Sequence, residues 1–225
     1  MWPGLLALLL LAQVPVAVSP DEVVRGDPQQ PNLALVFNVG AGAEPATAIL
    51  DTLADRELSA TFFVMGWWAE RHPDLLARIA ADGHEVASHG HSVFDLTQVP
   101  DAQVQADLLS ADAAISTVTG RSTRPLWSPS AGYRDPRVRR IAAELGYRPI
   151  LWTLDSLDWT VEATPESVYS RVINGATNGA IVVLHFDSPR TTTSTALVLP
   201  HLIDDLRAAG YRLVTITQLL AADTP

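Results

Sequence analysis

The 225-residue sequence contains no cysteine and no lysine, so its 15 basic side chains are all arginine. The absence of cysteine excludes disulfides, thiolate metal ligands, a cysteine nucleophile and a lipid anchor on cysteine. Positive charge is scarce: 25 acidic side chains give a formal net charge of -10. This balance argues against a nucleic-acid partner, because phosphate binding needs a basic face. Hydrophobic residues make up 48% of the chain, enough for one globular domain with a full core.

The sequence also lacks an apolar run that is long enough for a comfortable membrane span. Its main candidate lies in residues 1–19, "MWPGLLALLLLAQVPVAVS", where Leu5 to Ala12 are apolar and small residues follow. This pattern predicts a secretory signal peptide and an exported protein with no transmembrane span in its mature form, although no basic residue precedes the run. An uncleaved tail or an interfacial anchor is the alternative. Residues 20–32 are predicted to be a linker and residues 33–225 a single domain.

Short β-rich runs alternate with helical patterns from residue 33 onward. Several of the helical patterns stop at a glycine, which accepts the left-handed conformation that ends a helix. Alternating strands and helices imply right-handed βαβ units, a parallel sheet, and a functional site at the carboxyl ends of the strands. The expected strands are Leu33–Phe37, Thr61–Val64, Glu85–Ala87, Pro125–Trp127, Ile150–Leu154, Ile181–Leu184 and Leu213–Ile216.

The segments that follow these strands carry histidines and carboxylates, the residue types that acid–base and metal chemistry need. In order they resemble the polysaccharide deacetylases, the NodB-homology domain of carbohydrate esterase family four. The resemblance covers nearly all of residues 33–220 and includes "SATFFVMG", "DGHEVASHGHSVFDLT", "LWTLDSLDW", "GAIVVLH" and "AGYRLVTITQLL". It implies an α/β fold, a distorted parallel (β/α) barrel of about seven strands. It also implies a divalent metal held by one aspartate and two histidines, an aspartate as general base and a histidine as general acid.

Several of these roles fall on residues that cannot perform them. The resemblance places Asn38 at the position of the general base and Val39 at that of the aspartate ligand. His89 matches the first histidine ligand, whereas the second falls on Val93. Ser128 stands where the family has an arginine that pairs with the base. An amide does not accept the proton and a valine has no lone pair for a metal, so no bound cofactor is expected.

The remaining roles are retained. His185 matches the acid histidine, Asp158 the aspartate that orients it, and Trp159 the wall of the acetyl pocket. Trp127 and Tyr133 are candidates to extend this wall into a sugar-binding surface, because aromatic faces supply stacking area whether or not catalysis survives. The alternative for Trp127 is an ordinary core or rim position. The alternative for the His185–Asp158 pair is a hydrogen bond that only stiffens the pocket.

A zinc-like site rebuilt around His89 is a further alternative. His91, Asp95 and Asp187 lie close in sequence to the matched motifs and are its candidate substitute ligands. Without such a site, His89 either ties down its loop or contacts a ligand, and His91 is an exposed loop residue.

Three functions follow from these observations. The joint replacement of the base, its arginine partner and two metal ligands favours an exported, non-catalytic domain. Such a domain would bind an N-acetylated glycan, peptidoglycan or chitin-like, in the groove that the resemblance implies for the substrate. The second is an active hydrolase of non-peptide C–N bonds, either a polysaccharide deacetylase or a metal-independent hydrolase of small amides that uses His185 and Asp158. The third is a scaffold subunit for another exported protein. The sequence does not set the oligomeric state.

Overall fold

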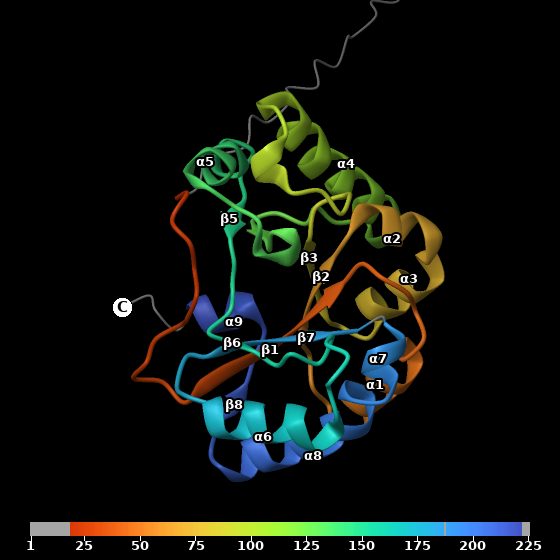
Figure 1. Cartoon of the computed structure of the whole chain (residues 1–225), viewed down its shortest axis with the longest axis vertical. Coiled ribbons are helices and arrows are strands. Elements are labelled where there is room, and N and C mark those ends of the chain that lie inside the picture. Colours follow the sequence, from red (N-terminus) through yellow and green to blue (C-terminus); the bar gives the residue numbers. More distant parts are fainter. Residues whose placement is uncertain (1–18, 187, 222–225) are drawn as a thin grey trace, which may run out of the picture.

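Helices surround a central parallel sheet in the computed structural model, which describes residues 19–186 and 188–221 (Figure 1). The strands are β1 (Asn32–Val39), β2 (Thr61–Val64), β3 (Glu85–Ser88), β4 (Leu126–Trp127), β5 (Arg148–Pro149), β6 (Leu154–Asp155), β7 (Ile181–His185) and β8 (Arg212–Leu213). The α-helices are α1 (Ala46–Asp55), α2 (Gly66–Arg71), α3 (Pro73–Ala81), α4 (Asp101–Thr119), α5 (Pro136–Glu144), α6 (Pro165–Gly175), α7 (Pro189–Thr192), α8 (Thr195–Ala208) and α9 (Ile216–Ala221). Leu96–Gln98 and Ser130–Gly132 form 3-10 turns.

The sheet is parallel throughout, with the strand order β5-β4-β3-β2-β1-β7-β6 and with β8 added beside β1. The expected α/β class is therefore confirmed. The sheet curls without closing, because β5 and β6 at the two ends of this order do not pair with each other within the described residues. Strand β1 lies at the centre and is buried at all eight positions, which explains its nearly continuous apolar sequence.

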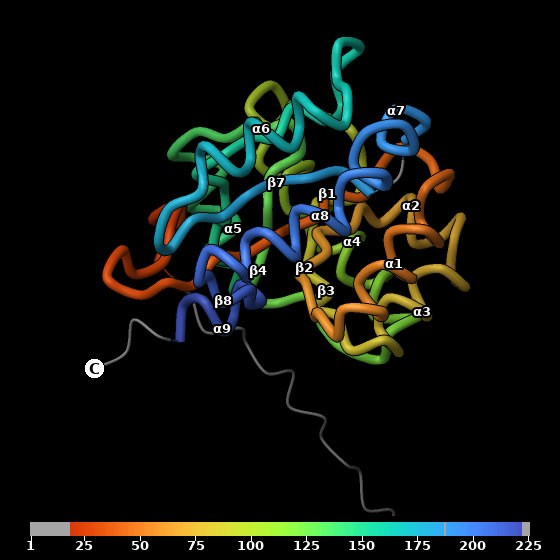
Figure 2. Tube along the Cα trace, turned by 90° about the horizontal axis from the view of Figure 1, so that it is seen from below, coloured from red at the N-terminus to blue at the C-terminus, as the bar shows by residue number. Residues whose placement is uncertain are grey.

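Helices cover the sheet on the outside. α6 and α8 run side by side along one flank, and α2, α3 and α4 cover another (Figures 1 and 2). The largest apolar cluster lies between the sheet and the helices and includes Phe37, Phe62 and Phe186. Within the part of the chain that the structure describes, we find no helix that combines the length and apolarity of a membrane-spanning segment.

The segment expected to be one strand, Ile150–Leu154, is divided. β5 ends at Pro149 and β6 begins at Leu154, because the residues between them pair with a distant part of the chain. Ile150 forms a bridge with Val23, and the Leu151 N–H donates to the Val23 carbonyl at 2.8 Å. Val23 is buried, so the segment expected to be a linker packs on the sheet at this point. Residues 1–18 of the expected signal peptide lie outside the described residues.

Candidate functional site

A cavity of about 680 Å³ lies at the carboxyl ends of β1 and β7, the end of the sheet where the sequence places the site. It brings together most of the residues predicted from the resemblance. Those that line it are Asn38, Val39, His89, Val93, Tyr133, Trp159 and His185. Trp152 and Asp155 also line the cavity, and we did not anticipate them as site residues.

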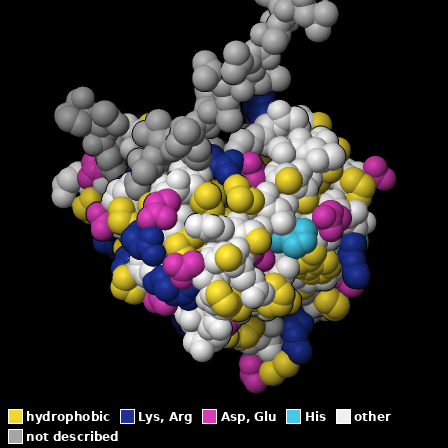
Figure 3. All heavy atoms as spheres, turned by 90° about the horizontal axis from the view of Figure 1, so that it is seen from above, with side chains coloured by type: hydrophobic (Ala, Val, Ile, Leu, Met, Phe, Trp, Pro, Cys, Tyr) yellow, Lys and Arg dark blue, Asp and Glu magenta, His cyan; other side chains and the backbone are white. Residues whose placement is uncertain are grey.

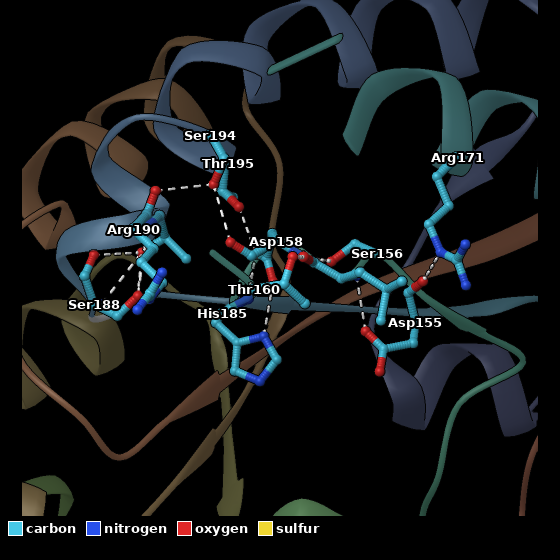
Figure 4. A network of polar contacts seen from close by, with 12 residues as sticks. Asp155, Ser156, Asp158, Thr160, Arg171, His185, Ser188, Arg190, Ser194 and Thr195 are labelled. Carbon is cyan, nitrogen blue, oxygen red and sulfur yellow. Dashed lines mark hydrogen bonds and ion pairs between the residues drawn. The ribbon is translucent and has the colours of Figure 1, made fainter. Parts of the chain in front are cut away.

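His185 and Asp158 form the pair that the resemblance predicts. The Asp158 carboxylate is fully buried and accepts hydrogen bonds from the backbone N–H and the Nδ1 of His185, each at 2.8 Å. Figure 4 shows the His185 ring on one side of Asp158 and Thr195 on the other. Because Nδ1 donates to the carboxylate, the Nε2 end of the imidazole is the end directed away from Asp158.

The first turn of α8 completes this network. The Thr195 hydroxyl donates to Asp158 Oδ2, and the Ser194 hydroxyl donates to the Asp158 backbone carbonyl at 3.2 Å (Figure 4). Both side chains are fully buried. Sequence analysis missed them, because a Ser/Thr-rich stretch 36 residues after Asp158 reads as a polar loop. The carboxylate is therefore held at both oxygens, and His185 is fixed in one orientation.

His89 is buried at the end of β3 and is held by a neighbouring strand. Its Nδ1 lies 2.8 Å from the backbone carbonyl of Ser128, so Nδ1 carries the proton and Nε2 is the acceptor. Burial lowers the pKa of His89 to about 4, with a smaller lowering from His185, while the Ser128 carbonyl opposes the shift. His89 is thus a neutral imidazole at neutral pH. Ser128 itself is buried and contributes its backbone to this contact.

Asn38 occupies the floor of the cavity beside His185. The two residues are direct partners in the register of β1 and β7. Asn38 is only 5% exposed, and its Oδ1 is buried with no hydrogen-bond partner among the described residues. Buried polar atoms in proteins nearly always have a partner, so this amide is a candidate for contact with a bound molecule.

The positions that the resemblance assigns to metal ligands do not fit a divalent ion. Val39 is fully buried and Val93 is 70% exposed, and neither side chain has a donor atom. His89 is the only imidazole or carboxylate at these positions, whereas catalytic metal sites use about three protein ligands. The structure contains no group of three or more histidine, aspartate or glutamate side chains that could hold a metal, as far as its described residues go.

The two candidate substitute metal ligands that the structure describes, His91 and Asp95, make other contacts. Asp95 caps the 3-10 turn that begins at Leu96, and it accepts from the Thr97 N–H at 2.9 Å and the Thr97 hydroxyl at 2.6 Å. His91 is half-buried rather than exposed, and its Nδ1 lies against Gly66, where a Cβ would come within 2.3 Å. Asp187 lies outside the described residues.

Asp107 in α4 supports the loop after β3, and sequence analysis missed it. Its carboxylate accepts hydrogen bonds from the backbone N–H groups of His91 and Ser92, each at 2.9 Å. Burial raises the pKa of Asp107, and these N–H groups oppose the shift. A signal was present in the sequence, because an aspartate stands on the apolar face of the helix between Val104 and Ala111.

The aromatic residues divide into rim and core. Trp159 is 50% exposed and Tyr133 is 47% exposed, and both line the cavity. The Trp159 ring lies 6.4 Å from the His185 ring, centroid to centroid. Trp127 is fully buried against the helix α4–α5 cluster and has no face available to a ligand, so the expectation that it extends a sugar-binding surface is wrong.

The surface seen in Figure 3 carries acidic and basic side chains interspersed with apolar ones. This face is not a continuous basic surface of the kind that phosphate backbones need.

A curled parallel sheet, a cavity at its carboxyl edge and a buried Asp–His pair define an α/β domain of the carbohydrate esterase type. The family model of polysaccharide deacetylases matches residues 25–150, and the chain belongs to this family. It is 29% identical to a peptidoglycan-N-acetylglucosamine deacetylase of Bacillus cereus over 84% of this chain and 87% of that protein. An uncharacterized protein of Bacillus subtilis, YlxY, is 31% identical over 91% of this chain, which spans 62% of that relative's length.

Among solved structures, the chain is similar to BA3943 of Bacillus anthracis, which is described as a pseudoenzyme of the CE4 family. The identity is 28% and the TM-score 0.83, with 90% of this chain and 69% of that chain covered. A mutant of the same protein, described as having restored enzymatic activity, matches with a TM-score of 0.83 at 26% identity over 90% of this chain and 72% of that chain.

Proposed function

We propose that this chain is a non-catalytic member of its family that binds an N-acetylated glycan in the cavity at the end of the sheet. The observation that carries this proposal is the neutral floor of the cavity. Asn38 and Val39 stand there in place of two carboxylates, while the fold, the Asp158–His185 pair and the exposed Trp159 are kept. The likeness to a pseudoenzyme of the same family supports this interpretation.

Deacetylation by the usual route lacks its first step. A general base contributes about 10²–10⁴-fold to a rate, and a metal ion adds several kcal/mol of charge stabilisation. Asn38 cannot take a proton from water at ordinary pH, and the ligand positions offer one donor, the His89 imidazole. His185 is held as an acid would be, but an acid without an activated nucleophile gives little acceleration.

Glycan binding uses parts of the site that catalysis does not need. Trp159 and Tyr133 present apolar rings at the rim of the cavity, and sugar rings stack on such faces through their C–H groups. The curated relatives with named activities include a peptidoglycan deacetylase. This likeness supports the further proposal that the protein acts at the cell envelope, exported by its N-terminal segment, with peptidoglycan or a chitin-like polymer as its ligand.

A second candidate function is hydrolysis of a small amide by His185 and Asp158 without a metal. The observation that favours it is the complete set of hydrogen bonds around Asp158, which fixes His185 beside the cavity. Hydrogen bonds of this kind orient a functional imidazole, and a His185–Asp158 pair without a function would not need them.

Affinity electrophoresis in gels containing peptidoglycan or glycol chitin tests the proposal. The expected result is retardation of the protein that Trp159→Ala abolishes and that Leu197→Ala, an exposed apolar truncation on α8, leaves unchanged. Acetate release is measured in parallel with and without added Zn²⁺. Absence of retardation in every N-acetylated polymer contradicts the proposal, and acetate or ammonia release that His185→Ala removes favours the hydrolase.

A further inference from the structure

Residues 22–26 precede β1 and are fixed to the sheet by backbone contacts. The Val23 N–H donates to the Pro149 carbonyl at 2.9 Å, and the Val23 side chain is buried. At the other end of the segment the Gly26 N–H donates to the Gly179 carbonyl at 2.8 Å, and a Cβ on Gly179 would come within 2.5 Å of the Gly26 oxygen. The segment is therefore part of the folded domain, and it begins beside α5 (Figure 1).

Glu22 lies at the start of this segment and holds two arginines. Its carboxylate accepts hydrogen bonds from Nε and Nη2 of Arg134 at 3.1 and 3.0 Å, and it lies 3.2 Å from Nη1 of Arg139 in α5. The Glu22 side chain is only 21% exposed, so these charges are partly shielded from solvent. A bidentate pair of this kind fixes the orientation of the guanidinium as well as its position.

Arg134 connects Glu22 to the wall of the cavity. Its Nη1 donates to the Gly132 carbonyl at 3.1 Å. Gly132 ends the 3-10 turn Ser130–Gly132, which lines the cavity together with the next residue, Tyr133. One arginine side chain thus links a carboxylate that lies 112 residues earlier in the sequence to a turn in the cavity wall.

The turn needs contacts with the rest of the fold, because its backbone is strained. Ala131 has a φ of 50° and a ψ of 17°, a left-handed conformation that glycine adopts readily and an L-alanine does not. Such a conformation persists only where the surrounding structure imposes it. The hydrogen bond from Arg134 to the Gly132 carbonyl is a contact of this kind, and its geometry depends on Glu22.

We propose that Glu22 is a positioning residue for the cavity: by orienting Arg134 it keeps the strained turn formed and the Tyr133 ring at the rim. The inference rests on the proposed glycan binding and adds that the segment before β1 takes part in it. Glu22 is not among the residues that line the cavity. It acts by raising the fraction of molecules whose cavity wall is ready to bind, and the apparent affinity is proportional to that fraction.

Isothermal titration with tetra-N-acetylchitotetraose compares the wild type with Glu22→Gln, which removes the charge and keeps the shape. We expect Glu22→Gln to bind about 10-fold more weakly, the loss that follows when the formed turn falls to about a tenth of the molecules. Asp21→Asn is the matched control. It removes the same charge from an exposed neighbour whose carboxylate accepts from the Ser19 hydroxyl, and it should bind as the wild type does.

Two measurements separate positioning from a general loss of stability. In an Arg134→Gln background, Glu22→Gln should weaken binding by no more than about 2-fold, because the side chain through which it acts is already gone. Amide hydrogen exchange follows the turn without any ligand, since the Gly132 and Tyr133 N–H groups are bonded within it. These two amides should exchange about 10-fold faster in Glu22→Gln, whereas the amides of β2 should exchange at the wild-type rate.

The outcomes distinguish this inference from the proposed function. The inference is overturned, and glycan binding is left intact, if Glu22→Gln binds as the wild type does or if the 10-fold loss persists in the Arg134→Gln background. Unchanged exchange of the Gly132 and Tyr133 amides in Glu22→Gln has the same meaning. Failure of the wild type to bind the tetramer overturns the inference together with the proposed function.

Discussion

The Asp158 carboxylate accepts two hydrogen bonds from one residue, His185: one from its backbone N–H and one from Nδ1, both at 2.8 Å. The backbone contact fixes the end of β7 and the ring contact fixes the imidazole, so one buried side chain sets both the position and the tautomer. This relationship does not depend on Asn38 and Val39 of β1, because Asp158 follows β6, which lies on the opposite side of β7 from β1.

Asp158→Asn should therefore destabilise the fold and release His185. An amide keeps the shape but turns one acceptor into a donor. In place of Oδ1 this donor opposes the His185 Nδ1–H, and in place of Oδ2 it opposes the His185 backbone N–H and the Thr195 hydroxyl. The free energy of unfolding should fall by about 3–5 kcal/mol, the cost of breaking a buried pair, as measured by urea denaturation. Thr195→Val, which removes one hydroxyl at nearly constant volume, should cost only about 1 kcal/mol. Unchanged stability and an unchanged ¹⁵N shift of His185 in Asp158→Asn would contradict this role.

His89 predicts a loss of stability in acid. The pKa of His89 in the folded chain is about 4, below the ordinary value of 6.5. Between pH 4 and pH 6.5 this side chain is therefore protonated in the unfolded chain and neutral in the folded chain. The free energy of unfolding is at its full value above pH 6.5, falls as the pH is lowered towards 4 and levels off below it. The total loss from this group is about 3 kcal/mol.

The contribution of His89 is separated by comparing variants over this pH range. His84 also has a pKa lowered by burial and acts in the same direction, whereas the raised pKa of Asp107 acts in the opposite one. His89→Asn keeps a side-chain N–H for the Ser128 carbonyl and should flatten the pH dependence of unfolding. His201→Gln, at an exposed position of α8, should leave the dependence as in the wild type. If the free energy of unfolding depends on pH equally in the wild type and in His89→Asn, the assignment of this pH dependence to His89 is wrong.

Asp107 predicts a local effect on the loop after β3. In Asp107→Asn the amide can accept only one of the two N–H groups of His91 and Ser92 and directs its own N–H at the other. Stability should fall by about 1–3 kcal/mol, and amide exchange at residues 90–93 should accelerate more than in the rest of the sheet. Asp55→Asn, an exposed position at the end of α1, is the matched control and should change neither quantity. Unaltered exchange at His91 and Ser92 would show that another contact holds the loop.

The sequence predicted the elements whose burial is simple. Thr61–Val64 is a strand with the expected bounds. A short, mostly apolar run between a helix and a glycine is typical of a buried strand. The central strand was expected over Leu33–Phe37, whereas β1 extends to Val39, so that Asn38 lies within the strand, opposite His185 of β7. Such strands can be predicted because the apolar residues that define them are close together in the sequence.

The features that sequence analysis missed depend on contacts between distant segments. Ile150 leaves the expected strand because Val23 pairs with it, and Thr195 bonds to Asp158 from a helix 37 residues further on. Trp127 is the last residue of β4 and could equally have faced the cavity or the core, since periodicity does not tell which face of a two-residue strand the helices cover. Asp107 is the exception, because its place on an apolar helix face was visible and was not used.

Val39→Asp alone should be strongly destabilising. Val39 is fully buried in the main apolar cluster, and an unpaired carboxylate there costs several kcal/mol. Thermal unfolding should show a large fall in the melting temperature, whereas Val93→His, at a position that is 70% exposed, should have little effect. A small effect of Val39→Asp would mean that the cavity floor tolerates charge, which weakens the description of it as a neutral site.

Combining Asn38→Asp, Val39→Asp and Val93→His with the native His89 should reverse part of this cost when Zn²⁺ is present. The three ligand positions then carry donor atoms, and a metal that binds only the folded chain stabilises it by about 2.7 kcal/mol at 100 times its Kd. The readouts are the melting temperature in EDTA and in ZnCl₂ and the metal content after gel filtration. A melting temperature of the triple variant that zinc does not raise would mean that the resemblance misplaces the ligand positions. Stoichiometric zinc in the wild type would instead mean that His89 has other partners, and the protein would then have to be treated as an enzyme.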